Sequence, residues 1–121
     1  MKKFEIKRGI NISHWLSQVF GFSPIETYIT SSDIQYIAEK GFDHIRLPID
    51  EEQLWDEAEN RLETSWTKMT WCIDECLKNN LKVIVDLHIL RSHHFNNSNN
   101  NEGAMTLWID PKAQERFLDI W

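Results

Sequence analysis

Polar side chains that can bind a ligand occur at or near the ends of three predicted β-strands. His14 follows the first strand, Arg46 ends the second, and the third delivers Asp86 and His88. In parallel α/β proteins the C-terminal ends of the strands form the rim at which ligands bind. Guanidinium, imidazole and carboxylate groups at that rim can hydrogen-bond the hydroxyl groups of a ligand. We therefore expect these side chains to line a site for a polar ligand.

Tryptophans near the same loops suggest a carbohydrate as that ligand. Trp15, Trp55 and Trp108 lie in or beside the loops after the predicted strands, and flat aromatic faces stack on the apolar faces of sugar rings. The alternative is that these indoles are buried in the core, because tryptophan buries a large apolar area. For three further tryptophans on predicted helices the core interpretation is favoured: Trp66, Trp71 and Trp121.

The elements that position these residues alternate between strand and helix. Apolar periodicity and breakers predict three strands, at 9–12, at 44–47 where Pro48 ends it, and at 81–87. A helix capped by Ser31 or Ser32 and followed by Gly41 lies between the first two strands. A short helix around 51–57 and a helix at 65–79 lie between the second and third, and a last helix follows Asp110-Pro111. This alternation indicates an α/β fold with a parallel sheet and right-handed crossovers.

Three strands and three longer helices are too few for a closed barrel. They suit either a small doubly wound domain or the opening of a larger fold. The apolar pattern of the last helix runs up to Trp121 without a capping residue or a polar tail, which favours the second interpretation.

Composition excludes several classes of protein. The chain has 121 residues, 41% hydrophobic and 12% aromatic, which is enough for a packed core in one domain or part of one. A net charge of −6 argues against a general nucleic-acid binder. No apolar run is long enough for a membrane helix or a secretory leader. The sequence thus fits a cytoplasmic chain, or a secreted one whose leader has been removed. The spacing of Cys72 and Cys76 predicts two free thiols one helical turn apart.

Three segments resemble glycoside hydrolase family 5, the cellulase family. RGINISHWL at residues 8–16 resembles the family's opening pattern RGxNxxxWL, and GFDHIRLP at residues 41–48 resembles its second strand, GFxxVRxP. VIVDLH at residues 83–88 resembles the third strand, VxxDLH. The segment from Leu107 and Trp108 through the final helix resembles the third helix of the family and its lead-in.

This resemblance implies a fold and an activity. The family fold is the (β/α)8 TIM barrel, so residues 1–121 are expected to be the N-terminal part of a catalytic barrel, with only the first three β/α units. Its members hydrolyse β-linked glycans with retention and use no metal or other cofactor. Arg46 would orient the nucleophilic carboxylate, and His88 would contact a sugar hydroxyl where the bond is cut. The substrate-binding residues expected are Arg46, His88, Asn11, His14 and His93.

The sequence also departs from the family pattern. Retaining hydrolysis needs two carboxyl groups about 5–5.5 Å apart, and the family's acid/base glutamate lies in an Asn-Glu-Pro motif that this chain lacks; Asn101-Glu102 is followed by Gly103. We therefore expect no catalytic residue in this chain. Ile89 replaces a second histidine that many members carry, so the motif does not specify the glycan.

Two alternatives remain open. The chain could be a self-standing α/β module that only binds carbohydrate or a protein partner. The second alternative is assembly: if the chain is stable alone, the exposed edges of a three-stranded sheet predict that it self-associates.

A metal site at His88, His93 and His94 is disfavoured, because their spacing matches no common zinc pattern.

Overall fold

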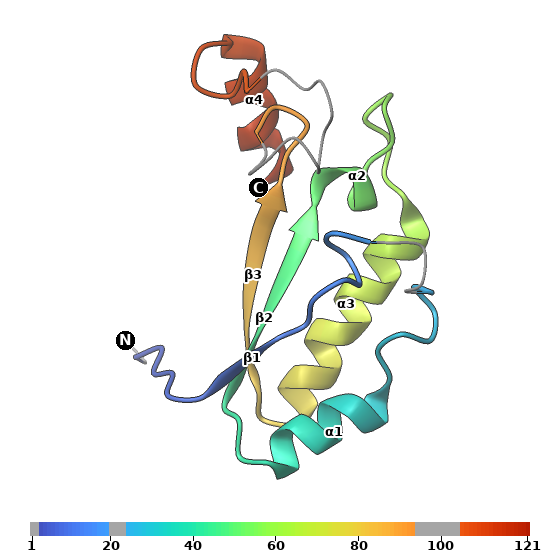
Figure 1. The fold of residues 1–121 in the computed structure, drawn as a ribbon, viewed down its shortest axis with the longest axis vertical. Helices are drawn as coiled ribbons and strands as arrows, with labels where there is room; N and C mark the ends of the chain where they lie inside the picture. Colours follow the sequence, from blue (N-terminus) through green and yellow to red (C-terminus); the bar gives the residue numbers. More distant parts are fainter. Residues whose placement is uncertain (1–2, 20–23, 94–104) are drawn as a thin grey trace.

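Three parallel strands form one sheet in the order β1-β2-β3 (Figure 1). The structure is a computed structural model that describes residues 3–19, 24–93 and 105–121. β1 spans Gly9–Asn11, β2 spans His44–Asp50 and β3 spans Lys82–Ile89. Asn11 pairs with Arg46, which pairs in turn with Ile84. The predicted parallel α/β architecture is confirmed within the described residues.

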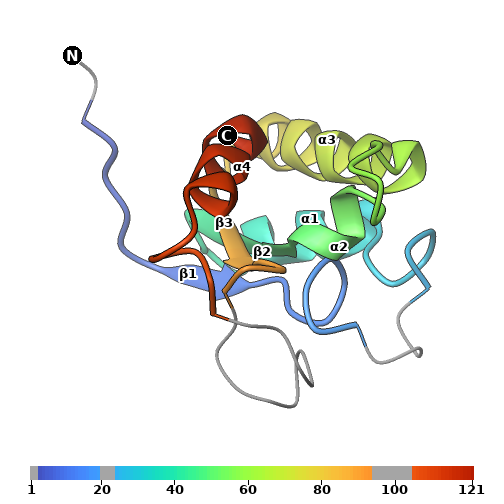
Figure 2. The same ribbon diagram turned by 90° about the horizontal axis from the view of Figure 1, so that it is seen from above.

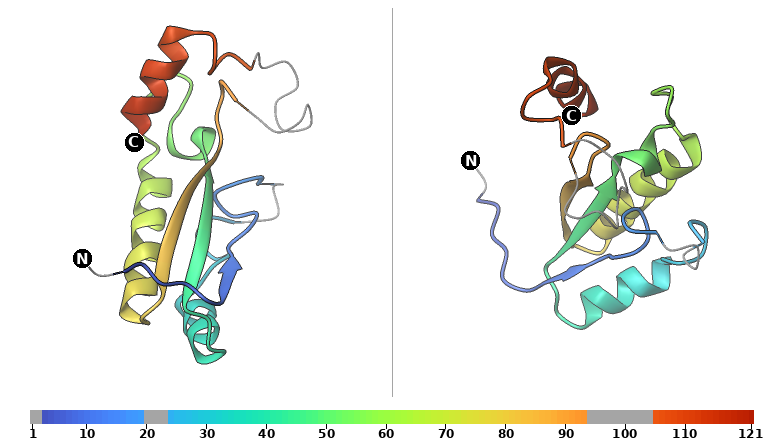
Figure 3. Two further views of the ribbon diagram at one scale, coloured as in Figure 1. Left: turned by 90° about the vertical axis from the view of Figure 1, so that its left-hand side faces the viewer. Right: turned by 45° about the horizontal axis from the view of Figure 1, so that its top comes forward.

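The helices cover a single face of the sheet. They are α1 (Ser31–Glu39), α2 (Glu51–Leu54), α3 (Glu63–Lys78) and α4 (Pro111–Ile120). Seen from above, α1, α3 and α4 all lie on the same side of the strands (Figure 2), and the two further views show α3 and α4 along that side (Figure 3). The opposite face of the sheet carries none of these helices.

The first helix begins one residue earlier than its predicted cap. Thr30 is the N-cap, not Ser31 or Ser32. Its hydroxyl accepts from the backbone N–H of Asp33, whose carboxylate accepts from the backbone N–H of Thr30 at 2.8 Å. This reciprocal capping box satisfies two backbone donors, whereas a serine cap without an acidic partner would satisfy only one. The predicted left-handed glycine after the helix is confirmed, since Gly41 has φ +79°.

Pro48 does not end β2, contrary to the prediction. The strand continues to Asp50, so Arg46 lies inside it and not at its end. The carbonyl of Arg46 accepts a hydrogen bond from the backbone N–H of Ile12. Backbone groups alternate in direction along a strand, so those of Pro48 also face the β1 side. β1 ends at Asn11, so the ladder needs no N–H donor at Pro48 and a proline fits there.

The core lies between the sheet and the helices. Alternate residues of β2, namely Ile45, Leu47 and Ile49, are buried and face α1 and α3. Trp15 and Trp55 are 1% and 7% exposed, so they belong to this core and cannot stack on a sugar. Trp108, at 70% exposure, remains accessible, and Trp121, expected in the core, is 66% exposed.

The apolar spacing of α3 predicts a buried stripe at Trp66, Met69, Ile73, Cys76 and Leu77, but the buried residues are Ser65, Met69, Cys72 and Cys76. Leu77 is 59% exposed, whereas Cys72 is fully buried beside Cys76. Both cysteines are free thiols, as predicted. They occupy the stripe where α3 packs on the sheet, because small apolar side chains allow close approach of helix and strand.

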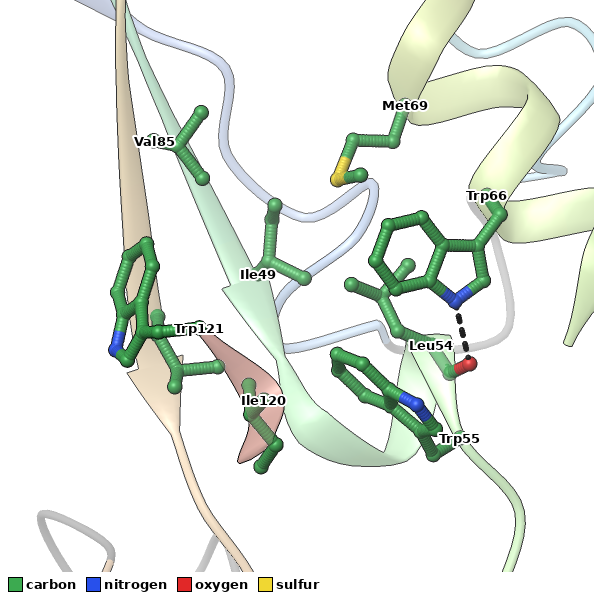
Figure 4. Close-up of a pocket in the computed structure, with 9 residues that line it drawn as sticks. Ile49, Leu54, Trp55, Trp66, Met69, Val85, Ile120 and Trp121 are labelled. Atoms are coloured by element: carbon green, nitrogen blue, oxygen red, sulfur yellow. Dashed lines mark hydrogen bonds between the residues drawn. The ribbon is translucent and has the colours of Figure 1, made fainter. Parts of the chain in front are cut away.

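An apolar groove remains between the sheet, α3 and the end of α4 (Figure 4). Met69 and Trp66 of α3 face Ile49 and Val85 of the sheet across it, and Trp66 donates its indole N–H to the carbonyl of Leu54. Ile120 and Trp121, at the end of α4, line the groove on the side next to β3. No helix in the described ranges is long and apolar enough to cross a membrane.

Candidate functional site

The in-register pairing of the strands gathers polar side chains on the face without helices. Paired residues of parallel strands point to the same side, so Asn11 and Arg46 share one face. Pro48 pairs with Asp86 and lies two residues after Arg46, so Asp86 also shares that face. His88 lies at a register shift, where Ile49 pairs with Leu87 but Asp50 pairs with Ile89, and its contacts with Arg46 and Asp86 place it in the same group. Residues far apart in sequence thus meet on one surface through strand pairing and side-chain contacts.

Arg46 lies at the centre of this group. Its Nη1 donates to Asn11 Oδ1 at 2.8 Å, and its Nη2 donates to Asp86 Oδ2. The same Nη2 is 3.1 Å from His88 Nδ1. The Arg46 side chain remains 37% exposed, so this fixed positive charge is accessible from the open face. Such a charge can bind and orient a carboxylate or a ligand hydroxyl.

Asp86 and His88 form a second contact within the group. His88 Nδ1 is 2.9 Å from Asp86 Oδ2, and the two side chains are 19% and 29% exposed respectively. Asn11 also donates from Nδ2 to Ser13 Oγ at 3.1 Å, which links the group to the loop after β1. The side chains of the site are therefore held by one another before any ligand arrives, which lowers the entropic cost of binding.

A buried carboxylate stands at the C-terminal end of β2. Asp50 is 2% exposed, and its Oδ2 accepts from the backbone N–H of Gln18 at 2.7 Å. Burial raises the pKa of Asp50 above its ordinary value, while the hydrogen bond from Gln18 and the charge of His88 lower it in part. Asp50 N also donates to Leu16 O at 2.8 Å. Asp50 therefore fixes the loop after β1 to the end of β2.

Glu51 anchors the loop that follows β3. Its side chain is 5% exposed and accepts from the backbone N–H of Arg91 at 3.0 Å. It also pairs with the Arg91 guanidinium at 3.4 Å and with Arg116 Nε of α4 at 3.2 Å. Arg91 in turn donates to the Trp55 carbonyl at 2.6 Å. One buried carboxylate thus ties the segment after His88 to both α2 and α4.

Two predicted site residues lie in loops with partners of their own. His14 has φ +59°, and its Nδ1 is 3.1 Å from the carbonyl of Gln18. His93 forms a two-way backbone bridge with Leu90 and packs edge-on against Trp108 at 5.9 Å between ring centroids. His94 and the Asn101-Glu102 pair lie outside the described residues. Among the described residues no group of three or more His, Cys, Asp or Glu side chains is placed to hold a metal ion.

Sequence reasoning placed Asp86 at the expected rim but did not include it among the substrate-binding residues. The signal was present, because two residues separated by one position in a strand share a face, and this spacing joins Asp86 to His88. No comparable signal exists for Glu51, whose partners Arg91 and Arg116 lie 40 and 65 residues away. The segment after β3 brings Arg91 to Glu51, and α4 brings Arg116 to the same carboxylate, so only the tertiary structure unites the three residues.

Comparison with known proteins places this arrangement in a family. The sequence matches the cellulase family, glycosyl hydrolase family 5, over residues 6–121. Endoglucanase C of Acetivibrio thermocellus is 38% identical over 119 residues, covering 95% of this chain and 34% of that protein. Cellodextrinase A of Ruminococcus flavefaciens is 30% identical over 122 aligned residues, covering 100% of this chain and 35% of that protein. The chain thus spans about a third of the length of these relatives.

A solved structure supports the same fold. A crystal structure of a glycoside hydrolase superposes with a TM-score of 0.76 at 23% sequence identity, covering 97% of this chain and 35% of that one. At this level of identity the superposition supports the fold alone. Because it extends over almost the whole chain, it includes the sheet and the helices that frame the site.

Proposed function

The chain belongs to glycosyl hydrolase family 5 and forms the first three β/α units of that family's (β/α)8 barrel, and we propose that it is the N-terminal part of a retaining β-glycanase. In this proposal Asn11, Arg46 and His88 contribute to the substrate-binding rim. The two catalytic glutamates are supplied by sequence that the 121 residues do not include. The substrate is a β-linked glycan, and neither a metal nor another cofactor takes part.

One observation carries the proposal. The cluster centred on Arg46 lies on the face that the helices leave open, and it combines a fixed cation with an amide, a carboxylate and an imidazole. Such a set can orient a nucleophilic carboxylate and bond the hydroxyls of a sugar ring. The 121 residues contain no Asn-Glu-Pro, so in this proposal they bind the substrate but do not break the glycosidic bond.

Binding and turnover of a soluble β-glucan by the purified chain test the two halves of this proposal. We expect cello-oligosaccharide to shift the NMR signals of Asn11 and His88, and we expect no release of reducing sugar. Arg46→Lys keeps the charge but loses the planar fork, so it weakens binding. Arg61→Lys is the matched control, because Arg61 stacks on Trp66 of α3 at 3.8 Å, away from the cluster. Turnover with retention by the 121-residue chain would contradict the proposal.

The coding sequence after Trp121 gives an independent test. A fourth strand leading to Asn-Glu-Pro is the expected result. A stop codon directly after Trp121 would refute a longer enzyme. It would favour a self-standing module that binds carbohydrate or a protein partner.

We also propose that the isolated chain self-associates. β1 and β3 are both edges of the sheet, Val85 is 37% exposed, and the groove of Figure 4 is lined by apolar side chains. Unpaired strand edges and apolar patches favour association between chains. Light scattering at high protein concentration is expected to give a mass above that of one chain. A well-behaved monomer would refute this proposal.

A further inference from the structure

Three polar atoms on the open face of the sheet lie within hydrogen-bonding distance of one another. His88 Nδ1 is 2.9 Å from Asp86 Oδ2 and 3.1 Å from Arg46 Nη2, and that Nη2 donates to the same Asp86 oxygen. A guanidinium only donates, a carboxylate only accepts, and a neutral imidazole nitrogen does one or the other according to its tautomer. The proton on His88 Nδ1 therefore decides which of the two neighbours it bonds.

The geometry of this triangle favours the bond to Asp86. The two hydrogens on an arginine terminal nitrogen diverge widely within the plane of the guanidinium. When one of them is aimed at Asp86, the other cannot also point at His88 Nδ1, because the two directions from Nη2 diverge by less than its two N–H bonds do. A carboxylate oxygen has two lone pairs and accepts over a broad range of directions, so Asp86 Oδ2 can accept from Arg46 and His88 together.

The other tautomer is also electrostatically worse. An unprotonated Nδ1 would place its lone pair 2.9 Å from a carboxylate oxygen with no proton between the two atoms. A protonated Nδ1 instead forms a charge-assisted hydrogen bond, which is stronger than a neutral one. The group is only partly exposed, with 19% for the His88 side chain, so water competes weakly for this contact.

We propose that Asp86 is a positioning residue that fixes His88 in the Nδ1-protonated tautomer. In the neutral ring Nε2 then carries a lone pair and accepts a hydrogen bond. A sugar hydroxyl that contacts Nε2 must therefore be the donor in that contact. This last consequence rests on the proposed glycan-binding function, whereas the tautomer itself does not. Asp86 also bonds Arg46, so one carboxylate orients both the imidazole of His88 and the guanidinium of Arg46.

Nitrogen-15 NMR of the imidazole rings tests the tautomer in the ligand-free chain. The spectrum is recorded near pH 8.5, about two units above the ordinary pKa of histidine, and His88 is assigned by the signals lost in His88→Gln. Protonated and unprotonated ring nitrogens give widely separated shifts. We expect Nδ1 of His88 to be the protonated nitrogen. A neutral His88 that is mainly protonated on Nε2 overturns the proposal, whatever any variant shows.

Asp86→Asn then tests the cause. Replacing a charge-assisted bond with a neutral one lowers the ratio of Nδ1-protonated to Nε2-protonated His88 by roughly fivefold. The matched control is Asp43→Asn, because Asp43 Oδ1 lies 2.6 Å from Nδ1 of His44 in a second aspartate–histidine pair. That variant should change His44 and leave His88 as it was. An unchanged His88 ratio in a folded Asp86→Asn chain overturns the proposal.

Adding a cello-oligosaccharide distinguishes this inference from the proposed function. If both hold, Nε2 of His88 shifts on binding while Nδ1 remains protonated. If the tautomer is as expected but no ring signal responds, the positioning role of Asp86 stands and the glycan-binding proposal fails.

Discussion

Removing the carboxylate of Glu51 should be among the most destabilising single changes in the described part of the chain. The Glu51 side chain is 5% exposed and is the shared partner of Arg91 and Arg116. Glu51→Ala removes a buried carboxylate partner from two guanidinium groups and the acceptor of the Arg91 backbone N–H. Arg116 is most affected, because its side chain is 19% exposed and its Nη2 is already buried without a partner among the described residues.

The magnitude follows from how buried each partner is. Breaking a buried ion pair by removing one partner costs about 3–5 kcal/mol, chiefly because the remaining charge is left uncompensated. The Arg91 side chain is 35% exposed, and water can solvate it after the change, so the lower end applies. We expect Glu51→Ala to lower the free energy of unfolding by about 3 kcal/mol and Tm by roughly 10 °C. Glu51→Gln keeps an acceptor for the Arg91 N–H and should lose less.

Urea denaturation followed by tryptophan fluorescence measures this loss, since the Arg116 guanidinium lies 5.2 Å from the Trp55 ring centroid. The matched control is Glu59→Ala. Glu59 also contacts Arg116, at 3.8 Å, but its side chain is 63% exposed, and an exposed pair contributes about 0–1 kcal/mol. If Glu51→Ala and Glu59→Ala cost the same, burial does not set the strength of these pairs and the reasoning is wrong.

Three further changes have defined outcomes. A Cβ added at Gly9 would lie 2.1 Å from Nε2 of His44, so Gly9→Ala should cost about 1–3 kcal/mol by overpacking, and a loss below 0.5 kcal/mol in thermal melts would show that the ring moves aside. Thr30→Ala removes the capping hydroxyl of α1 and should cost about 1 kcal/mol, read as a lower urea midpoint at an unchanged m-value. Burial raises the pKa of the Asp50 carboxyl above 3.8, so the folded chain binds the carboxyl proton more tightly than the unfolded chain does. The stability that Asp50 contributes is therefore present at low pH and is lost as the pH rises through the folded-state pKa. The stability of Asp50→Asn relative to the parent chain should therefore rise as the pH is raised from 3.5 to 7. A stability difference that stays constant or falls over this range would refute the expected direction.

The corrections to the sequence-based predictions have local causes that only neighbouring elements reveal. Pro48 was expected to end its strand, but β1 stops at Asn11 and leaves no ladder for the missing N–H to break. Trp15 was a candidate for sugar stacking, yet its indole N–H donates to Ile25 O at 3.0 Å and its ring is buried. In both cases the residue type permitted two outcomes, and the packing around it selected one.

The sequence by itself determined the alternation of strands and helices, the free cysteines of α3, the left-handed glycine after α1 and the resemblance to a glycan-hydrolysing family. These features depend on residues within a few positions of one another, where periodicity and capping act directly. Tertiary structure decided which polar groups meet. Arg46 reaches Asn11 across 35 residues and Asp86 across 40, and Glu51 reaches Arg116 across 65. Strand register and helix docking fix those contacts, because a slip of one residue would turn every side chain of a strand to the opposite face.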